Sequence, residues 1–170
     1  APITYGVYAL LPTLRMNGLL ANKHIPKAYL RASISQRLAL LQGLMDTDGY
    51  ADARGQCEFT TTREPLAHDV RELICSLGIK ATITVGRAML NGKDCGAKYR
   101  IKFVTGLPVF RLARKLERQK REDFRPTVGR RYITAIEPIA SVPVKCVAID
   151  SSIRVYLASE SWVPTHNTDL

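Results

Sequence analysis

Two carboxylates, Asp46 and Asp48, end an apolar run and are followed directly by Gly49. The run from Leu40 to Met45 has the character of a helix, so both acids fall at its electronegative C-terminal end. Two acids there repel each other and the helix dipole, and the arrangement is costly unless a cation sits nearby. A divalent metal fits, because hard cations take carboxylate oxygens. The alternative from these residues alone is a buried helix that ends in an Asp-Gly turn.

The tail His166-Asn167-Thr168 is a second group with specific chemistry. An asparagine side-chain amide can attack its own carbonyl carbon, which forms a succinimide and cuts the peptide bond that follows. The neighbouring histidine can transfer the proton that this step requires. The following hydroxyl can act as an acyl acceptor. The tail therefore favours self-cleavage after Asn167.

The element that must present the two acids is a helix expected over residues 33–47. Ser33 and Gln36 make a capping box at its start, which satisfies N–H groups of the first turn. Gly49 is expected to supply the stop. Gly43, inside the helix, costs about 1 kcal/mol relative to alanine. We expect the close approach of a second backbone to offset that cost.

Hydrophobic periodicity predicts the remaining elements in the order strand, strand, helix, strand, strand, helix. The expected ranges are a strand between residues 49 and 54, a strand over 58–62, a helix over 66–77, a strand over 80–87, a hairpin turn at Asn91-Gly92, a strand over 97–104 and a helix over 107–120. A short helix is expected within 13–20 and a loop over 22–26. After Tyr132 only short strands are expected, over 133–137, 144–149 and 154–158.

The expected strands alternate between polar and apolar residues, so the sheet has one apolar face and one face rich in Lys, Arg and Thr. Such a face suits DNA, because cations hold phosphates while Thr and Arg side chains reach base edges. A solvated sheet face is the alternative. The residues expected to contact DNA are Arg54, Thr60, Thr62, Lys80, Thr82, Thr84, Lys98 and Arg100.

The composition agrees with a nucleic-acid partner. The chain carries 25 Lys and Arg against 15 Asp and Glu, a net charge of +10, which favours binding to a polyanion. A basic but inert surface is the alternative. No apolar run approaches the roughly 20 residues of a membrane span, and no signal-peptide layout opens the chain, so we expect a cytoplasmic protein without a membrane partner. The cysteines are too scattered for a zinc site; Cys57 and Cys75 are expected in the core and Cys95 in a hairpin.

The run that ends at Gly49 resembles the LAGLIDADG motif of homing endonucleases. The matching residues are Leu41, Gly43, Leu44, Asp46, Asp48 and Gly49. The resemblance implies that a second motif helix packs against Gly43 and that Asp48 binds the catalytic Mg²⁺. It further implies a role for Asp46 in capping or orienting the helix end, and an active-site lysine at Lys102, with Lys98 as the alternative. Double-stranded DNA is the implied substrate.

The tail resembles the C-terminal splice junction of inteins, and residues 145–150 and 156–157 look like the last blocks of a Hint splicing domain. Carried over, Asn167 is the cyclising residue and His166 its assistant. Thr168 is the acceptor nucleophile and the first residue of the host protein, for which residues 168–170 weakly indicate a replicative DNA helicase.

Cys146 raises the question of the intein class. Cysteine at this position, with Thr165 before the tail histidine, is similar to the class 3 inteins, in which this cysteine attacks the upstream splice junction directly. A buried core cysteine is the alternative. The class 3 pattern also needs a tryptophan in the N-terminal half, and Trp162 lies elsewhere.

The expected fold is therefore α+β: an αββαββα LAGLIDADG repeat followed by the C-terminal β-strands of a horseshoe-shaped, all-β Hint domain. The expected divisions are 1–32 for the end of a preceding endonuclease segment, 33–121 for the repeat, 122–131 for a linker, 132–167 for the splicing part and 168–170 for host residues.

The implied function is protein splicing coupled to metal-dependent double-strand DNA cleavage. An N-terminal splicing half and a first motif helix are not found in the sequence, so we expect a C-terminal piece of a large intein that is inactive alone and needs that half as a partner. One alternative is a splicing element with an inactive, DNA-binding or structural endonuclease insert. Another is a free-standing LAGLIDADG DNA-binding protein or RNA maturase, against which the tail argues.

Overall fold

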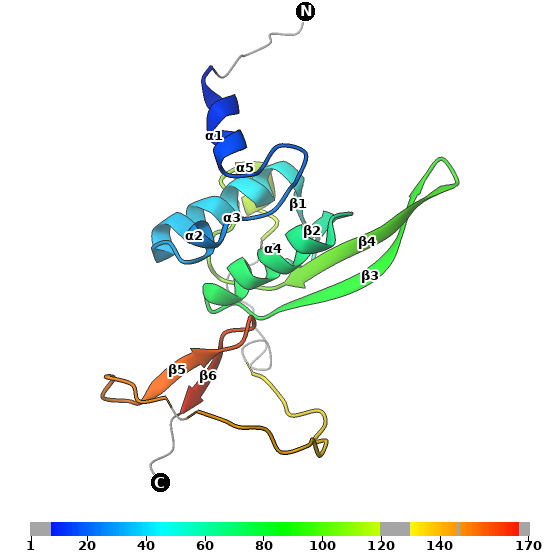
Figure 1. Cartoon of the computed structure of the whole chain (residues 1–170). Coiled ribbons are helices and arrows are strands. Elements are labelled where there is room, and N and C mark those ends of the chain that lie inside the picture. The colour runs from blue at the N-terminus through cyan, green and yellow to red at the C-terminus, as the bar shows by residue number, and fades with distance from the viewer. Residues whose placement is uncertain (1–7, 120–129, 146, 167–170) are drawn as a thin grey trace, which may run out of the picture.

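A four-stranded antiparallel sheet with helices on one face carries most of the chain in the computed structural model, which describes residues 8–119, 130–145 and 147–166 (Figure 1). The elements in chain order are α1 Leu10–Met16, α2 Lys27–Leu30, α3 Ile34–Asp48, β1 Gly49–Ala51, β2 Cys57–Thr61, α4 Glu64–Ser76, β3 Ala81–Leu90, β4 Lys93–Phe103, α5 Ala113–Leu116, β5 Val155–Ala158 and β6 Val163–His166. The order from α3 to α5 is the αββαββα order expected from the sequence.

Helix α3 begins where its sequence predicts. The Ser33 hydroxyl accepts the Gln36 N–H at 3.3 Å, and the Gln36 side chain accepts the Ser33 N–H at 3.1 Å, so the capping box is complete. The helix ends at Asp48, but Gly49 has a φ of −84° and is no left-handed cap. A Cβ on Gly49 would lie 2.6 Å from the Met45 backbone, so close approach is what requires glycine here.

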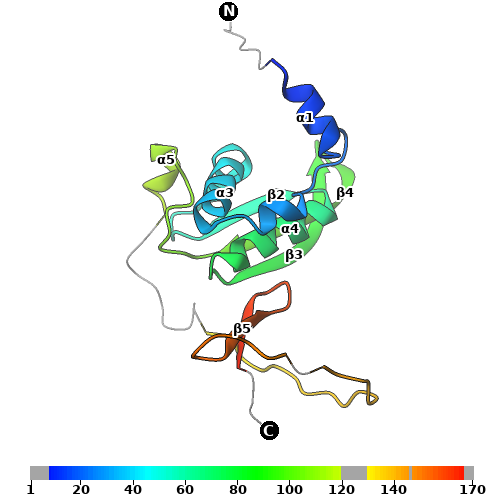
Figure 2. The ribbon, with the colours of Figure 1, turned by 60° about the vertical axis from the view of Figure 1, so that its left-hand side comes forward.

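The sheet has the order β1-β2-β4-β3, and its register separates an apolar from a polar face. Phe59 lies opposite Ile101, which lies opposite Ile83, and this row packs against the helices. Figure 2 shows α3 and α4 on the same side of the sheet. Fully buried residues of the helices and strands close the core between them: Leu41, Met45, Cys57, Phe59, Val70, Leu73, Ile74 and Ile101.

The strands β3 and β4 continue past the rest of the sheet as a two-stranded arm (Figure 1). The predicted turn closes it, because Asn91 and Gly92 both have positive φ, 50° and 78°. A register shift lies between Arg87 and Met89. Cys95 is exposed on the arm, as expected, whereas Cys57 and Cys75 are buried in the core.

The helix expected over 107–120 is much shorter, since within the described residues α5 spans only Ala113–Leu116. Val109 and Phe110 are buried in the core. Gln119 holds the chain before α5 in a non-helical path, since its side chain accepts the Val109 N–H and donates to the Thr105 and Leu107 carbonyls. Tertiary packing thus overrides the local periodicity.

The C-terminal part forms one small hairpin, β5 and β6, which confirms a strand near 154–158. The strands expected over 133–137 and 144–149 are not formed by the described residues. Their apolar side chains are exposed instead, with Ile133 and Ile136 at 84% and 88%. Local strand preference does not create a strand without a pairing partner, and the body offers them none. Strand β6 was not predicted, because Pro164 interrupts its pattern.

None of the helices in the described ranges combines the length and the apolar character that crossing a bilayer requires.

Candidate functional site

The end of α3 separates the two acids that the sequence singles out. The Asp46 carboxylate accepts the backbone N–H groups of Arg111, at 3.0 and 3.2 Å, and Leu112, at 3.1 Å. It therefore anchors the segment that leads into α5, a structural role close to the expected capping role. Asp48 is exposed at the last position of α3, which leaves its carboxylate accessible.

The cation that this acidic helix end requires is Lys115. Its ammonium donates to the carbonyls of Met45, Asp46 and Gly49 at 3.0, 2.8 and 2.7 Å. Asp46 lies in the last turn of α3, whose carbonyls lack intrahelical partners, while the Met45 carbonyl also accepts the Gly49 N–H and Gly49 itself opens β1. A positive charge at this helix end is favourable, because it lies at the negative end of the helix dipole. Repulsion at the end of α3 is therefore no argument for a metal. This contact could not be predicted from the sequence, because Lys115 lies in a run rich in Lys and Arg.

The Lys115→Met variant tests this contact. Methionine keeps the apolar stem and removes the ammonium, which removes three hydrogen bonds to backbone carbonyls. We expect the variant to lose about 2 kcal/mol of unfolding free energy, measured from urea denaturation. The control, Lys93→Met at the exposed arm, should stay within about 0.5 kcal/mol of the unmodified protein. Equal stability of the two variants would contradict the role given to Lys115.

Asp48 lines a hollow of about 300 Å³, to which Thr60 of the polar sheet face also contributes. The hollow is lined from α3, from β2 and its flank, from the start of α4 and from the segment before α2 by Leu19, Lys23, His24, Leu44, Asp48, Phe59, Thr60, Thr61 and Leu66. The His24 Nδ1–H donates a hydrogen bond to the Asn22 carbonyl at 3.0 Å. The described part of the chain holds no cluster of three or more His, Cys, Asp or Glu that would bind a metal by itself. Among the residues that line the hollow, Asp48 is the single carboxylate.

The polar face of the sheet brings together most of the residues expected to contact DNA. Thr60, Arg100 and Thr84 lie in one row across β2, β4 and β3. Lys102 lies opposite Thr82 in the next row, and Lys98 continues the same face of β4. One surface therefore presents alternating hydroxyls and cations.

Glu58 on this face is a residue whose role the sequence did not reveal. It makes two hydrogen bonds to the Arg100 guanidinium, at 2.8 and 2.6 Å, and its carboxylate lies 3.9 Å from Lys102. Partial burial of Glu58 opposes its ionisation, but the hydrogen bonds and the charge of Arg100, with help from Thr60 and Lys102, outweigh burial and lower its pKa. One expected DNA contact, Arg100, and the expected active-site lysine, Lys102, therefore lie beside a carboxylate.

Three further predicted contacts lie outside these rows. Lys80 precedes β3; its ammonium donates to the Arg130 carbonyl at 3.0 Å and lies 6.0 Å from the Tyr132 ring centre. Arg54 is exposed in the turn between β1 and β2, where its N–H donates to Asp52. Thr62 is exposed just after β2.

The structure describes only some of the residues predicted to carry out splicing. Thr165 lies opposite Tyr156 in the β5–β6 hairpin and donates to the Val163 carbonyl at 3.2 Å. His166 is exposed and lies opposite Val155. Cys146, Asn167 and Thr168 lie outside the described residues. The geometry of the predicted splicing group is therefore visible only at its Thr165-His166 side.

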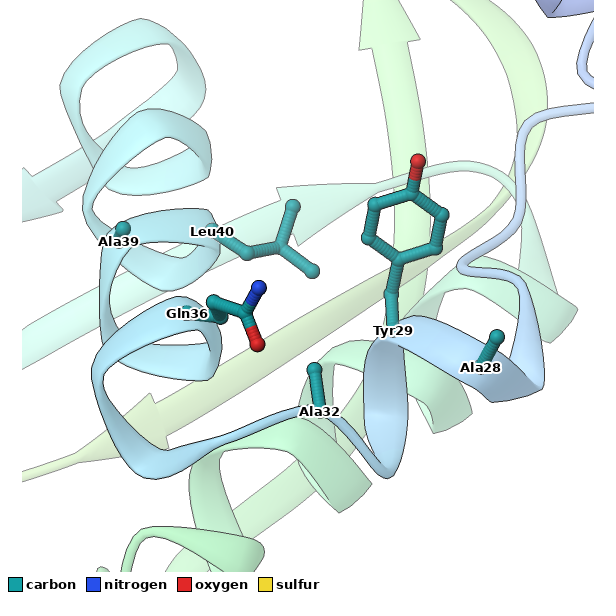
Figure 3. A pocket seen from close by; sticks show the side chains of 6 residues that line it. All are labelled: Ala28, Tyr29, Ala32, Gln36, Ala39 and Leu40. Carbon is teal, nitrogen blue, oxygen red and sulfur yellow. The ribbon is translucent and has the colours of Figure 1, made fainter.

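One face of α3 has no neighbour among the described residues. A Cβ added to Gly43 would meet no atom within 4 Å. On the same helical face, Gln36, Ala39 and Leu40 line a groove of about 510 Å³. Figure 3 shows Tyr29 from α2 and Leu40 from α3 bordering that hollow, whose other lining residues are Ala28 and Ala32. The close backbone expected at Gly43 is not supplied by this part of the chain.

Comparison with known proteins relates the chain to two groups. Over all of its length it is 40% identical to a replicative DNA helicase DnaB from Mycobacterium intracellulare, of which it spans only 30%. A replicative DNA helicase DnaB from Mycobacterium leprae (strain TN) is 45% identical over 38 residues, 22% of this chain and 6% of that protein. The model of the LAGLIDADG-like domain matches residues 35–125. This combination is consistent with an intein within a replicative helicase. The match covers α3, the four-stranded sheet and the polar face on which the candidate site lies, so the chain belongs to the LAGLIDADG-like domain family.

Proposed function

We propose that this chain is the C-terminal part of an intein that splices itself out of a replicative helicase and carries one repeat of a metal-dependent, double-strand DNA endonuclease. The observation that carries the proposal is the polar sheet face, with the exposed carboxylate of Asp48 at its edge. The second support is the LAGLIDADG-like match inside a chain that spans only 30% of a helicase. The coarser part, DNA binding, rests on the family itself.

In this proposal the polar face lies along DNA. Arg100, Lys98 and Lys102 are the cations that hold phosphates, while Thr60, Thr82 and Thr84 reach base edges. The net charge of +10 draws the protein to DNA from a distance. Arg54 and Thr62, at the two ends of β2, extend the same surface, and Lys80 joins it if it leaves its contacts near Tyr132.

Asp48 is the proposed ligand of Mg²⁺. An exposed carboxylate facing a hollow at the DNA surface suits a cation that is held by one or two carboxylates together with substrate phosphates. Mg²⁺ would polarise the phosphodiester and lower the pKa of the attacking water. Lys102, two residues from Arg100 on β4, is the proposed lysine that stabilises the charge developing on the phosphate.

The open face of α3 is the proposed seat of the second motif helix, supplied by a further segment of the same intein. The absence of a side chain at Gly43, and the small residues Ala39 and Ala32 nearby, allow a second helix backbone to come close. That helix would bring its own carboxylate next to Asp48. The N-terminal half of the splicing domain is proposed to cover the apolar side chains exposed over residues 133–144.

The splicing chemistry is proposed to run through the tail. The Cys146 sulfur attacks the carbonyl carbon of the upstream junction, and the peptide bond from that carbon to the first intein nitrogen breaks, which leaves the N-terminal host segment as a thioester. The Thr168 hydroxyl then takes that segment over as an ester and releases the Cys146 thiol. The Asn167 side-chain nitrogen then attacks its own carbonyl carbon, and the bond from that carbon to the Thr168 nitrogen breaks. His166 transfers the proton that leaves the attacking amide to the departing amine, while Thr165 orients this histidine. The ester finally rearranges to a peptide bond between the host segments.

A second candidate function is a splicing element whose endonuclease repeat binds DNA without cutting it. The pairing of Glu58 with Arg100, and its approach to Lys102, favours this alternative, because it neutralises cations on the face that would meet the phosphates. The two functions differ in one observable, the cleavage of DNA.

The complete precursor tests both reactions. Expressed with its host segments, it should yield the excised intein and the ligated host protein, seen by mass. The purified intein should cut the host gene lacking the intein in Mg²⁺ and stop when EDTA removes the metal. Splicing without any DNA cleavage supports the second candidate. A precursor that does not process itself contradicts the splicing proposal.

The Glu58→Gln variant tests the orientation of the DNA on the sheet. Removing the carboxylate frees Arg100 and Lys102, so the variant should bind duplex DNA more tightly, and its affinity should fall more steeply with salt, by about one unit of slope for each freed cation. Fluorescence anisotropy at several salt concentrations measures both. Glu117→Gln, at an exposed acid beyond α5, is the control and should leave the slope unchanged. A Glu58 variant with the control's slope would place the DNA elsewhere.

The lowered pKa of Glu58 also makes the stability of the fold depend on pH. Since its pKa is lowered in the folded state, the ion pair stabilises the fold above the pKa of an unfolded glutamate, about 4.3, and this contribution is lost as the pH falls through the folded-state pKa. The difference in unfolding free energy between the Glu58→Gln variant and the unmodified protein should therefore disappear in acid.

A further inference from the structure

Trp162 is the contact between the C-terminal hairpin and the helical layer of the body. It lies in the turn between β5 and β6, where its φ is 49°, and packs against the hydrophobic core cluster. The guanidinium carbons of Arg31 and Arg37 lie 5.2 and 5.5 Å from its ring centre. Both distances are within the range of cation–π attraction.

The two arginines are themselves held in place by the body. Arg37 is buried, and its guanidinium donates to the carbonyls of Ala32 and Ser76 at 2.9 and 2.7 Å. Arg31 is paired with Glu72 of α4. Because these partners belong to α4 and to the segment between α2 and α3, the site for the indole is built by the body of the chain and not by the hairpin.

The residue before the tryptophan reinforces the contact. The Ser161 hydroxyl accepts a hydrogen bond from Arg71 of α4, and the Ser161 carbonyl accepts one from Arg131 at 2.8 Å. Both views of the molecule show the turn of the hairpin directed to the side of the body where α4 lies (Figure 1, Figure 2). The turn is thus held by side chains from α3, from α4, from the residue after α2 and from the segment after residue 129.

The held turn leads directly into the tail. Strand β6 begins at Val163, the residue after Trp162, and ends at His166. Pairing with β5 fixes the register, with Thr165 opposite Tyr156 and His166 opposite Val155. A strand rises about 3.3 Å per residue, so His166 lies about 13 Å along the strand from Trp162. Anchoring Trp162 therefore fixes the start of the strand that carries His166 at its end.

We infer that Arg31 and Arg37, acting through Trp162, are positioning residues for the tail reaction, so that the endonuclease repeat is a structural part of the splicing apparatus. This rests on the splicing function proposed above. The arginines do not touch the reacting atoms; they hold the turn that leads into β6, the strand that ends at His166. Loss of the clamp misplaces the histidine relative to the bond that it must serve, and misplacement of that kind costs rate more than stability.

Fluorescence reports the clamp directly, because Trp162 is the only tryptophan in these 170 residues. In this chain, Arg31→Ala should shift the emission to longer wavelength while the far-ultraviolet circular dichroism stays unchanged. Arg87→Ala is the matched control. Arg87 is as exposed as Arg31, with 63% against 59% of the side chain accessible, and is likewise paired with a carboxylate, Asp94, but it is not near the indole.

The rate of splicing in the complete precursor measures whether the contact with Trp162 positions the tail. Arg31→Ala and Trp162→Ala should each slow release of the C-terminal host segment about tenfold. Arg31→Lys should restore much of the rate, because an ammonium also interacts with the ring, and Arg87→Ala should match the unmodified precursor. Restoration by lysine separates positioning from a loss of folding.

Two results would overturn the inference. An Arg31→Ala precursor that releases its C-terminal host segment at the unmodified rate would show that the contact with Trp162 does not position the reaction. Unchanged tryptophan emission in that variant would show that Arg31 does not hold the indole. An unmodified precursor that never releases its tail is a different failure, which removes the splicing proposal and the positioning role with it.

Discussion

The Asp48→Asn variant of the complete intein is expected to bind its DNA target and leave it uncut. Asparagine keeps the shape of the side chain at the end of α3 and removes the charge that would hold Mg²⁺. Because the metal is worth several kcal/mol in the transition state, cleavage should fall about 1000-fold or more. The measurement is cleavage of a labelled duplex under single-turnover conditions, with anisotropy to show that binding persists.

Asp46→Asn is the matched control for that experiment. Asp46 is two residues away on the same helix, but its carboxylate holds the N–H groups of Arg111 and Leu112. This variant should melt at a lower temperature and still cut DNA below that temperature. If Asp48→Asn cut at the unmodified rate while Asp46→Asn did not, the metal ligand would have to be reassigned.

The Asn167→Ala variant of the complete precursor is expected to release no C-terminal host segment at all. Alanine has no amide nitrogen, so neither a succinimide nor a broken bond to Thr168 can form. Products separated by gel electrophoresis and identified by mass would measure this. The branched ester on Thr168 should accumulate in its place, because the earlier steps do not use Asn167.

Two comparison variants give that result its meaning. His166→Ala keeps the nucleophile and removes the proton carrier, so tail release should be slowed about 100-fold or more rather than abolished. Thr168→Ala removes the acceptor, so the tail should be released without ligation of the host segments. Tail release from Asn167→Ala would contradict the assignment of the cyclising residue.

Local signals predicted the elements that depend on neighbouring residues. The capping box of Ser33 and Gln36 sets the start of α3, and Asn91-Gly92 sets the turn of the arm. Strand alternation was enough to group Thr60, Thr84 and Arg100, since a two-residue period assigns side chains to faces whatever the order of the strands.

Long-range contacts account for what the sequence did not reveal. Lys115 donates hydrogen bonds to carbonyls between 66 and 70 residues away, and Trp162 contacts Arg31 and Arg37. Neither contact leaves a pattern among neighbouring residues of the sequence. The periodicity over 107–120 was misread because Val109 and Phe110 enter the core from an extended segment. Side chains near Ile133 and Val144 have strand character, but strand formation needs a partner that the described residues lack.

The arm of β3 and β4 divides the sheet into two parts that open independently. Strand β2 pairs with β4 only from Tyr99 to Phe103, so from Gly86 to Lys98 each strand of the arm has a single neighbour. A two-stranded hairpin of this kind is marginal in water. The amide protons of the arm therefore exchange through local fraying, whereas those around Ile101 wait for the whole body to unfold. A DNA duplex that meets both parts finds a rigid platform joined to a segment that takes its final shape on contact.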